Sequence, residues 1–163
     1  MSRIAREIQF ETSNQIPDAT SVLGESQKAL IDLFGRYDRS RSIVEKAAIT
    51  QEICTALRTE IQIEEDIFYP AVKKVLKETG TISAAIMANS ILKYLIAEIE
   101  DLDADSSVYD IKVRVLSEHV KENIIEKQTK LFPKVNASGS LDVWGLGAQL
   151  KARKEKLMDT AVC

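Results

Sequence analysis

Six polar residues interrupt the apolar stripes of four helical stretches in this sequence, at positions that should face a common core. They are Gln27, Glu60, Glu64, Asn89, Asn123 and Lys127. A polar layer of this kind inside a helical bundle is where metal and ligand sites are built. Only the two glutamates carry oxygens that suit a hard metal ion, and none of the six residues is a histidine. The sequence therefore predicts a site scaffold whose metal chemistry has been removed or replaced.

The composition is that of one globular domain. The chain has 163 residues, 45% of them hydrophobic and 29% charged, which is long enough to bury a core without disulfides. The net charge is −3, with acids and bases interleaved, so we expect no nucleic-acid partner. The two cysteines, Cys54 and Cys163, form no disulfide framework, and residues 1–17 contain no signal-peptide run. The most apolar stretch, 82–99, is interrupted by polar residues, so we expect a soluble, cytoplasmic protein without a membrane span.

Apolar residues repeat at helical spacing in most of the chain, and strand-like alternation is rare. We expect helices over about 18–38, 43–76, 82–102 and 109–134, and a further amphipathic segment over 141–158. Four long helices with short turns favour the all-α class and an antiparallel up-down four-helix bundle. The expected divisions are an N-terminal arm (1–17), the bundle (18–135) and a C-terminal helix packed on it (136–163).

Individual residues refine these expectations. Asp18 and Thr20 are candidate N-caps of the first helix, and Pro70 should kink or divide the second. Gly80 suits a left-handed C-cap that ends the second helix. Ile86 should point inward from the third helix. Trp144 should dock the C-terminal segment on the bundle, with the basic face of that segment in water.

Two motifs and the C-terminal segment resemble parts of hemerythrin-like domains of the bacterial HHE type. Residues 61–71, IQIEEDIFYPA, are similar to the family's second-helix signature, in which a histidine precedes a ligand glutamate by four residues and an aromatic–proline pair follows. Residues 131–134, LFPK, are similar to the end of its fourth helix, and 141–158 to its C-terminal helix. The resemblance covers about 18–158. It implies a hemerythrin-type bundle, which in family members holds a carboxylate-bridged di-iron centre that binds oxygen or senses related small molecules.

The resemblance also implies where the metal ligands would lie, and only one of six is kept. The family's histidines fall on Gln27, Glu60, Asn89 and Asn123, its second-helix glutamate on Glu64, and its fourth-helix glutamate on Lys127. Amide side chains are weak neutral donors beside imidazole, and an ammonium repels a divalent cation. We therefore expect no di-iron centre and no metal cofactor. Instead, Lys127 should form an ion pair with Glu60 or Glu64 in a metal-free core.

Two functions remain open on the sequence. In the first, this is a hemerythrin-like protein without the di-iron, oxygen-binding site, acting as a binding or regulatory module for an unknown protein or a small polar ligand. In the alternative, it holds iron or another divalent metal through Glu60, Glu64, Glu126 and His119, with Glu122 as a further candidate, and senses oxygen or a small molecule. No nucleophile–base pair, glycine-rich phosphate loop or zinc-type cysteine spacing occurs, so enzyme activity is not expected.

Overall fold

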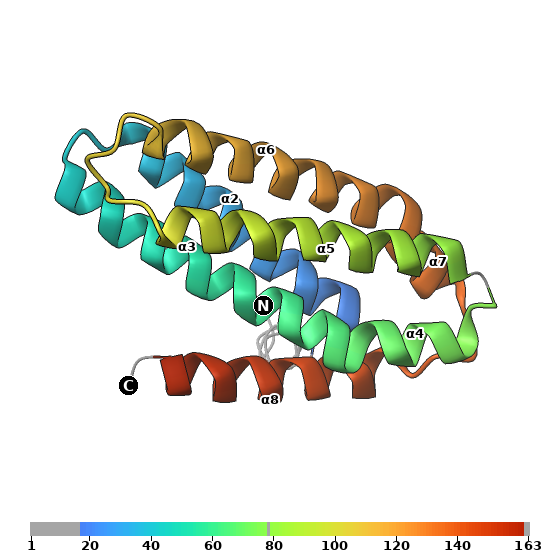
Figure 1. Cartoon of the computed structure of the whole chain (residues 1–163). Coiled ribbons are helices and arrows are strands. Elements are labelled where there is room, and N and C mark those ends of the chain that lie inside the picture. The colour runs from blue at the N-terminus through green and yellow to red at the C-terminus, as the bar shows by residue number, and fades with distance from the viewer. Residues whose placement is uncertain (1–16, 78, 162–163) are drawn as a thin grey trace, which may run out of the picture.

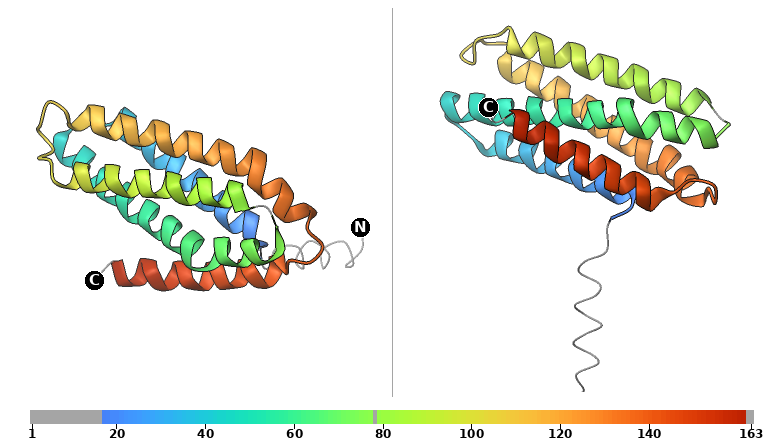
Figure 2. Two further views of the ribbon diagram at one scale, coloured as in Figure 1. Left: turned by 45° about the vertical axis from the view of Figure 1, so that its right-hand side comes forward. Right: turned by 90° about the horizontal axis from the view of Figure 1, so that it is seen from below.

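Four long helical arms form an antiparallel up-down bundle, and a further helix lies along one side of it (Figures 1 and 2). The structure is a computed structural model that describes residues 17–77 and 79–161. The elements are α2 (Ala19–Arg39), α3 (Ile43–Ile63), the π-helix η2 (Glu64–Phe68), α4 (Tyr69–Val75), α5 (Thr79–Glu100), α6 (Tyr109–Glu126), the π-helix η3 (Lys127–Leu131), α7 (Phe132–Ala137) and α8 (Val143–Ala161). The expected all-α bundle with a C-terminal helix is confirmed. Apart from Pro17, the expected N-terminal arm lies outside the described residues.

The second arm of the bundle (α3, η2 and α4) and the fourth arm (α6, η3 and α7) each contain a π-helical turn. The turn η2 runs directly into Tyr69–Pro70, and η3 into Phe132–Pro133. Proline has no N–H for the helical ladder and its ring crowds the preceding turn, so the backbone must widen before it. Pro70 was expected to kink or divide the second helix, and the structure has a π turn directly before it. Such turns are frequent at functional sites, and here the first residues of the two turns are Glu64 and Lys127.

Two expectations about the helices are wrong. Gly80 does not end the second arm, because α4 already stops at Val75, with Leu76 extended, and α5 begins at Thr79. No described residue has a positive φ, so Gly80 is an ordinary helical residue rather than a left-handed cap. Ile86 is 38% exposed, because it falls at the edge of the inward stripe of α5. By contrast, Asp18 is the N-cap of α2, as expected, and accepts a hydrogen bond from the Ser21 N–H at 2.9 Å.

The core consists of two hydrophobic clusters, one on each side of the polar layer. The first includes Leu30, Phe34, Leu57, Leu92 and Leu116. The second includes Leu23, Phe68, Ile82, Leu131 and Leu150. Along each arm, the polar residues occur between members of the two clusters, so burial of the apolar clusters brings the polar residues together.

Helix α5 is the most apolar arm. By length and composition alone, its segment Gly80–Glu100 could cross a membrane. Of the most apolar 18 residues in this segment, 33% are buried within the protein. A core helix of a bundle meets the same criterion, so length and composition do not by themselves make α5 a membrane span.

Helix α8 docks on the bundle through a different residue from the one expected. Trp144 is 54% exposed, whereas Leu146, Gly147 and Leu150 are buried on another face of the helix. A Cβ at Gly147 would lie 2.2 Å from the backbone oxygen of Pro17. Only a glycine therefore lets α8 approach the start of α2 this closely.

We predict that Gly147→Ala destabilises the protein by about 1–3 kcal/mol, the usual effect of overpacking, since the atoms that the new methyl group meets belong to rigid backbone. Chemical denaturation would measure the change. Gly24→Ala is the matched control, because a Cβ at Gly24 would meet no atom within 4 Å beyond its chain neighbours and the backbone of its own helix, and alanine in a helix interior should stabilise by about 0.5–1 kcal/mol. An equal response of the two variants would contradict the close approach of α8.

Candidate functional site

The six polar residues expected from the sequence are all buried in one layer across the bundle. Their exposed fractions are Gln27 2%, Glu60 4%, Glu64 0%, Asn89 0%, Asn123 8% and Lys127 6%. Every one of the four arms contributes to the layer, and the second and fourth arms contribute through their π turns as well. Charged side chains are almost never this buried unless they are paired, so their partners determine what the layer can do.

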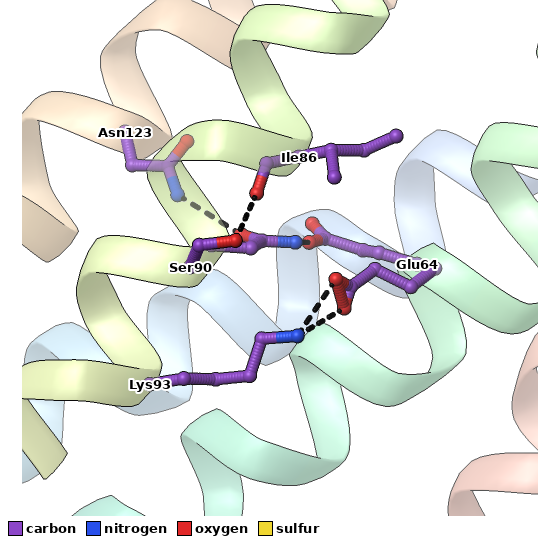
Figure 3. Close-up of polar contacts among 7 residues, drawn as sticks. Glu64, Ile86, Ser90, Lys93 and Asn123 are labelled. Carbon is purple, nitrogen blue, oxygen red and sulfur yellow. Dashed lines mark hydrogen bonds and ion pairs between the residues drawn. The ribbon is translucent and has the colours of Figure 1, made fainter. Parts of the chain in front are cut away.

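Lys127 and Glu64 form a buried ion pair at the centre of the layer. The Lys127 ammonium donates a hydrogen bond to Glu64 Oε1. The second oxygen of Glu64, Oε2, accepts a hydrogen bond from Asn89 Nδ2 at 3.0 Å, and Asn89 Oδ1 accepts one from Asn123 Nδ2 at 3.4 Å (Figure 3). The ion pair predicted for Lys127 is therefore present, with Glu64 as its partner. Both Glu64 oxygens are engaged by groups of the protein itself.

Glu60 is buried and has no hydrogen-bond partner among the described residues. Neither of its oxygens has a hydrogen bond within the residues that the structure describes. Burial, and then the nearby charge of Glu64, raises the pKa of Glu60 to about 8, against smaller opposing effects of Lys127 and Lys154. Ser26 lies close enough to lower this pKa slightly, but without a hydrogen bond to either oxygen. At neutral pH Glu60 is therefore mainly protonated, and the layer holds one anion and one cation.

Several residues around the layer were not found by sequence reasoning. Gln128 Nε2 donates to Gln27 Oε1 at 3.0 Å, while Gln27 Nε2 and the Tyr69 hydroxyl are buried without partners in the described chain. Lys154 on α8 donates to the Ser26 hydroxyl at 2.6 Å, although this basic face was expected to be solvated. Helical periodicity gave no signal for these contacts, because they depend on the π turns and on how α8 docks.

The alternative metal-ligand set is not assembled. His119, Glu122 and Glu126 are exposed on α6, and Glu126 pairs with Lys130, one turn further along the chain, at 2.8 Å. Across the described ranges, no group of three or more histidine, cysteine, aspartate or glutamate side chains could hold a metal ion.

A di-iron centre also does not fit the six layer residues. They include no imidazole, and the ammonium of Lys127 occupies the Glu64 oxygen that a metal would need. A divalent cation beside this ammonium would be repelled.

We predict that stability falls with rising pH because of Glu60. The Glu60 carboxyl has a pKa near its ordinary value of 4.5 in the unfolded chain and of about 8 in the folded protein. The stability that the protonated Glu60 contributes is therefore fully present below pH 4.5 and is lost as the pH rises from 4.5 to 8. The free energy of unfolding should fall by about 3–5 kcal/mol across this range. Denaturation of wild type and Glu60→Gln from pH 5 to 9 would test this, with the exposed Glu126→Gln as control. Parallel curves for wild type and Glu60→Gln would refute the assignment.

We predict that Lys127→Met costs about 3–5 kcal/mol, because it leaves Glu64 charged and buried without its cation. The matched control is Lys93→Met, which removes another lysine–glutamate pair between helices, with Glu65 at 2.9 Å (Figure 3). Lys93 is half exposed, so its loss should cost about 0–1 kcal/mol. Equilibrium denaturation in urea gives both values. If Lys127→Met changed the free energy of unfolding by less than about 0.5 kcal/mol, as is usual for exposed sites, the side chain of Lys127 would be solvent-exposed and not buried.

The fold matches a known structure, although the sequence matches no family model and no curated protein. The similar structure is a crystal structure of a hemerythrin HHE cation-binding domain-containing protein from Mycobacterium kansasii. The TM-score is 0.77 at 19% sequence identity, and the match covers 90% of each chain. At this identity the likeness establishes the architecture, and the chain has the helical-bundle fold of a hemerythrin HHE domain.

Proposed function

We propose that this is a hemerythrin-like protein without a metal site, which acts as a binding or regulatory module and not as an enzyme. Its partner would be another protein or a small polar ligand, and not a nucleic acid. The observation that carries the proposal is the Lys127–Glu64 ion pair. An ammonium on the chain stands where the family resemblance would place a metal-ligating glutamate.

The energetics of the pair support a metal-free state. A buried carboxylate needs a cation or a proton. Glu64 has the cation of Lys127, and Glu60, with a pKa of about 8, retains a proton. The layer is thus electrically balanced without any added ion. A metal would have to displace Lys127 from Glu64 and leave the ammonium buried beside a second positive charge.

The buried nucleophile candidates also support a non-enzymatic role. Burial raises the pKa of the Cys54 thiol to about 11, so at neutral pH this side chain is an unreactive thiol. Burial also raises the pKa of Tyr69 well above its ordinary value, with the charge of Glu64 adding to the effect. The only histidine of the chain, His119, is exposed on α6, where no described cysteine, serine or threonine forms a hydrogen bond with it.

We predict that wild-type protein, purified without oxygen and without chelators, contains no stoichiometric iron, manganese or zinc by elemental analysis. Its thermal midpoint should not change when Mn²⁺ or Fe²⁺ is added. Lys127→Glu removes the ammonium and adds a third carboxyl group, so this variant should be destabilised and should then gain stability from the same ions. Lys93→Glu is the control for a general effect of charge. Two tightly bound metal ions in the wild type would refute the proposal and favour oxygen or small-molecule sensing.

A further inference from the structure

A groove with a volume of about 600 Å³ runs between α5 and the fourth arm and reaches the polar layer. On the α5 side its wall includes the small residues Gly80, Ala84 and Ala88, which leave the space open. Asn123 and Lys127 are the two layer residues that also line the groove, and both are buried. The groove therefore connects the surface with the part of the core where a metal site would be expected.

Asn123 and Lys127 have hydrogen-bonding capacity that the described residues leave unused. A lysine ammonium has three donors, and that of Lys127 forms a hydrogen bond only with Glu64 in the part of the chain that the structure describes. Asn123, 8% exposed, donates to Asn89, but its own side-chain oxygen accepts no hydrogen bond from residues 17–77 or 79–161. The Asn123 oxygen is not among the fully enclosed atoms that lack a partner, so a molecule in the groove could reach it. The deep end of the groove thus offers donors and an acceptor side by side.

Charge limits the kind of group that can enter. Lys127 is already neutralised by Glu64, so an anionic head group would leave an unbalanced negative charge in a buried position. A cationic head group would meet the Lys127 ammonium directly. On the rim, the charges of Glu126 and Lys130 neutralise each other and Glu122 is negative, so the rim offers no surplus of positive charge to an anion. An uncharged head group that both accepts and donates a hydrogen bond fits best.

The walls favour an apolar body for such a molecule. Besides the small residues, the groove is lined by Ile91 and Leu92 from α5 and by Leu131 from η3. Ligand pockets typically have volumes of about 300–1,000 Å³, mostly apolar walls and a few polar groups that fix orientation. The segment of α5 from Gly80 to Leu92 is about 18 Å long at about 1.5 Å per residue, enough for a medium-length alkyl chain.

We propose that this groove binds a small, uncharged and mostly apolar molecule whose single hydroxyl or carboxamide group lies between Lys127 and Asn123. The inference rests on the proposed function, because a metal-bound layer would not present the Lys127 ammonium to the groove. It changes the small polar ligand of that proposal to an amphipathic alcohol or amide, polar only at its head group, because apolar residues line much of the groove. Binding would add hydrogen bonds to Lys127 and Asn123, and would thereby couple the groove to the ion pair of the core.

Three probes with the same alkyl chain would test the head group: 1-octanol, octanoate and octylammonium, titrated at pH 7 by calorimetry and by amide NMR. We expect 1-octanol to bind at least about tenfold more tightly than either charged probe, because an unpaired buried charge costs more than the 1.4 kcal/mol that a tenfold change represents. The amide shifts should concentrate on α5 and α6. Equal affinities, tighter binding of a charged probe, or no binding of 1-octanol would overturn the proposal.

Two alanines of α5 provide a matched pair of variants. Ala88→Phe fills the groove and should abolish octanol binding, whereas Ala97→Phe adds the same ring at an exposed position of α5 outside the groove and should not. Asn123→Leu should weaken octanol binding by about tenfold, since it removes the acceptor. Equal binding by Ala88→Phe and wild type would show non-specific partition and overturn the proposal. If the protein is metal-free and Lys127→Met is destabilised, but 1-octanol does not bind, the groove proposal fails and the proposed function stands. If the wild-type protein binds metal stoichiometrically, both proposals fail.

Discussion

The structure depends on the pairing of two opposite charges in the middle of a hydrophobic core. Glu64 and Lys127 belong to different arms, far apart in the chain, and each begins a π turn that is followed by an aromatic–proline pair. Because neither charge could be buried alone, the two arms must lie in one register. The amides of Asn89 and Asn123 extend this constraint to the third arm and along the fourth, so the polar layer fixes the alignment that the apolar clusters by themselves would leave looser.

Much of this could be predicted from helical periodicity. The positions of Gln27, Glu60, Glu64, Asn89, Asn123 and Lys127 within apolar stripes were enough to expect that they share a buried layer, and the family resemblance gave the bundle. The sequence left the partner of Lys127 open between Glu60 and Glu64. Glu60 and Glu64 lie one helical turn apart on the same face, so helical periodicity does not distinguish them as partners, and the choice depends on how the second and fourth arms pack together.

Two of the wrong expectations were drawn from residue type alone. Trp144 was expected to dock α8, but α8 docks through Leu146, Gly147 and Leu150, and at Gly147 the absence of a side chain is what matters. Gly80 was expected to end a helix because glycine often does, yet it is an internal residue of α5, where its lack of a side chain widens the groove. Residue type reports what a side chain can do, whereas the docking of α8 depends on how closely two backbones approach, and the place of Gly80 depends on where α5 begins.

The contact between Lys154 and Ser26 has a consequence for the interior of the bundle. Lys154 belongs to α8, outside the four arms, yet its positive charge reaches Glu60 and makes loss of the Glu60 proton easier. The acidity of a carboxyl group inside the bundle is therefore set in part by a helix on its surface. Loss of the Lys154 charge alone, with α8 still in place, would strengthen the hold of Glu60 on its proton, so a side chain of an outer helix contributes to the protonation state of the core.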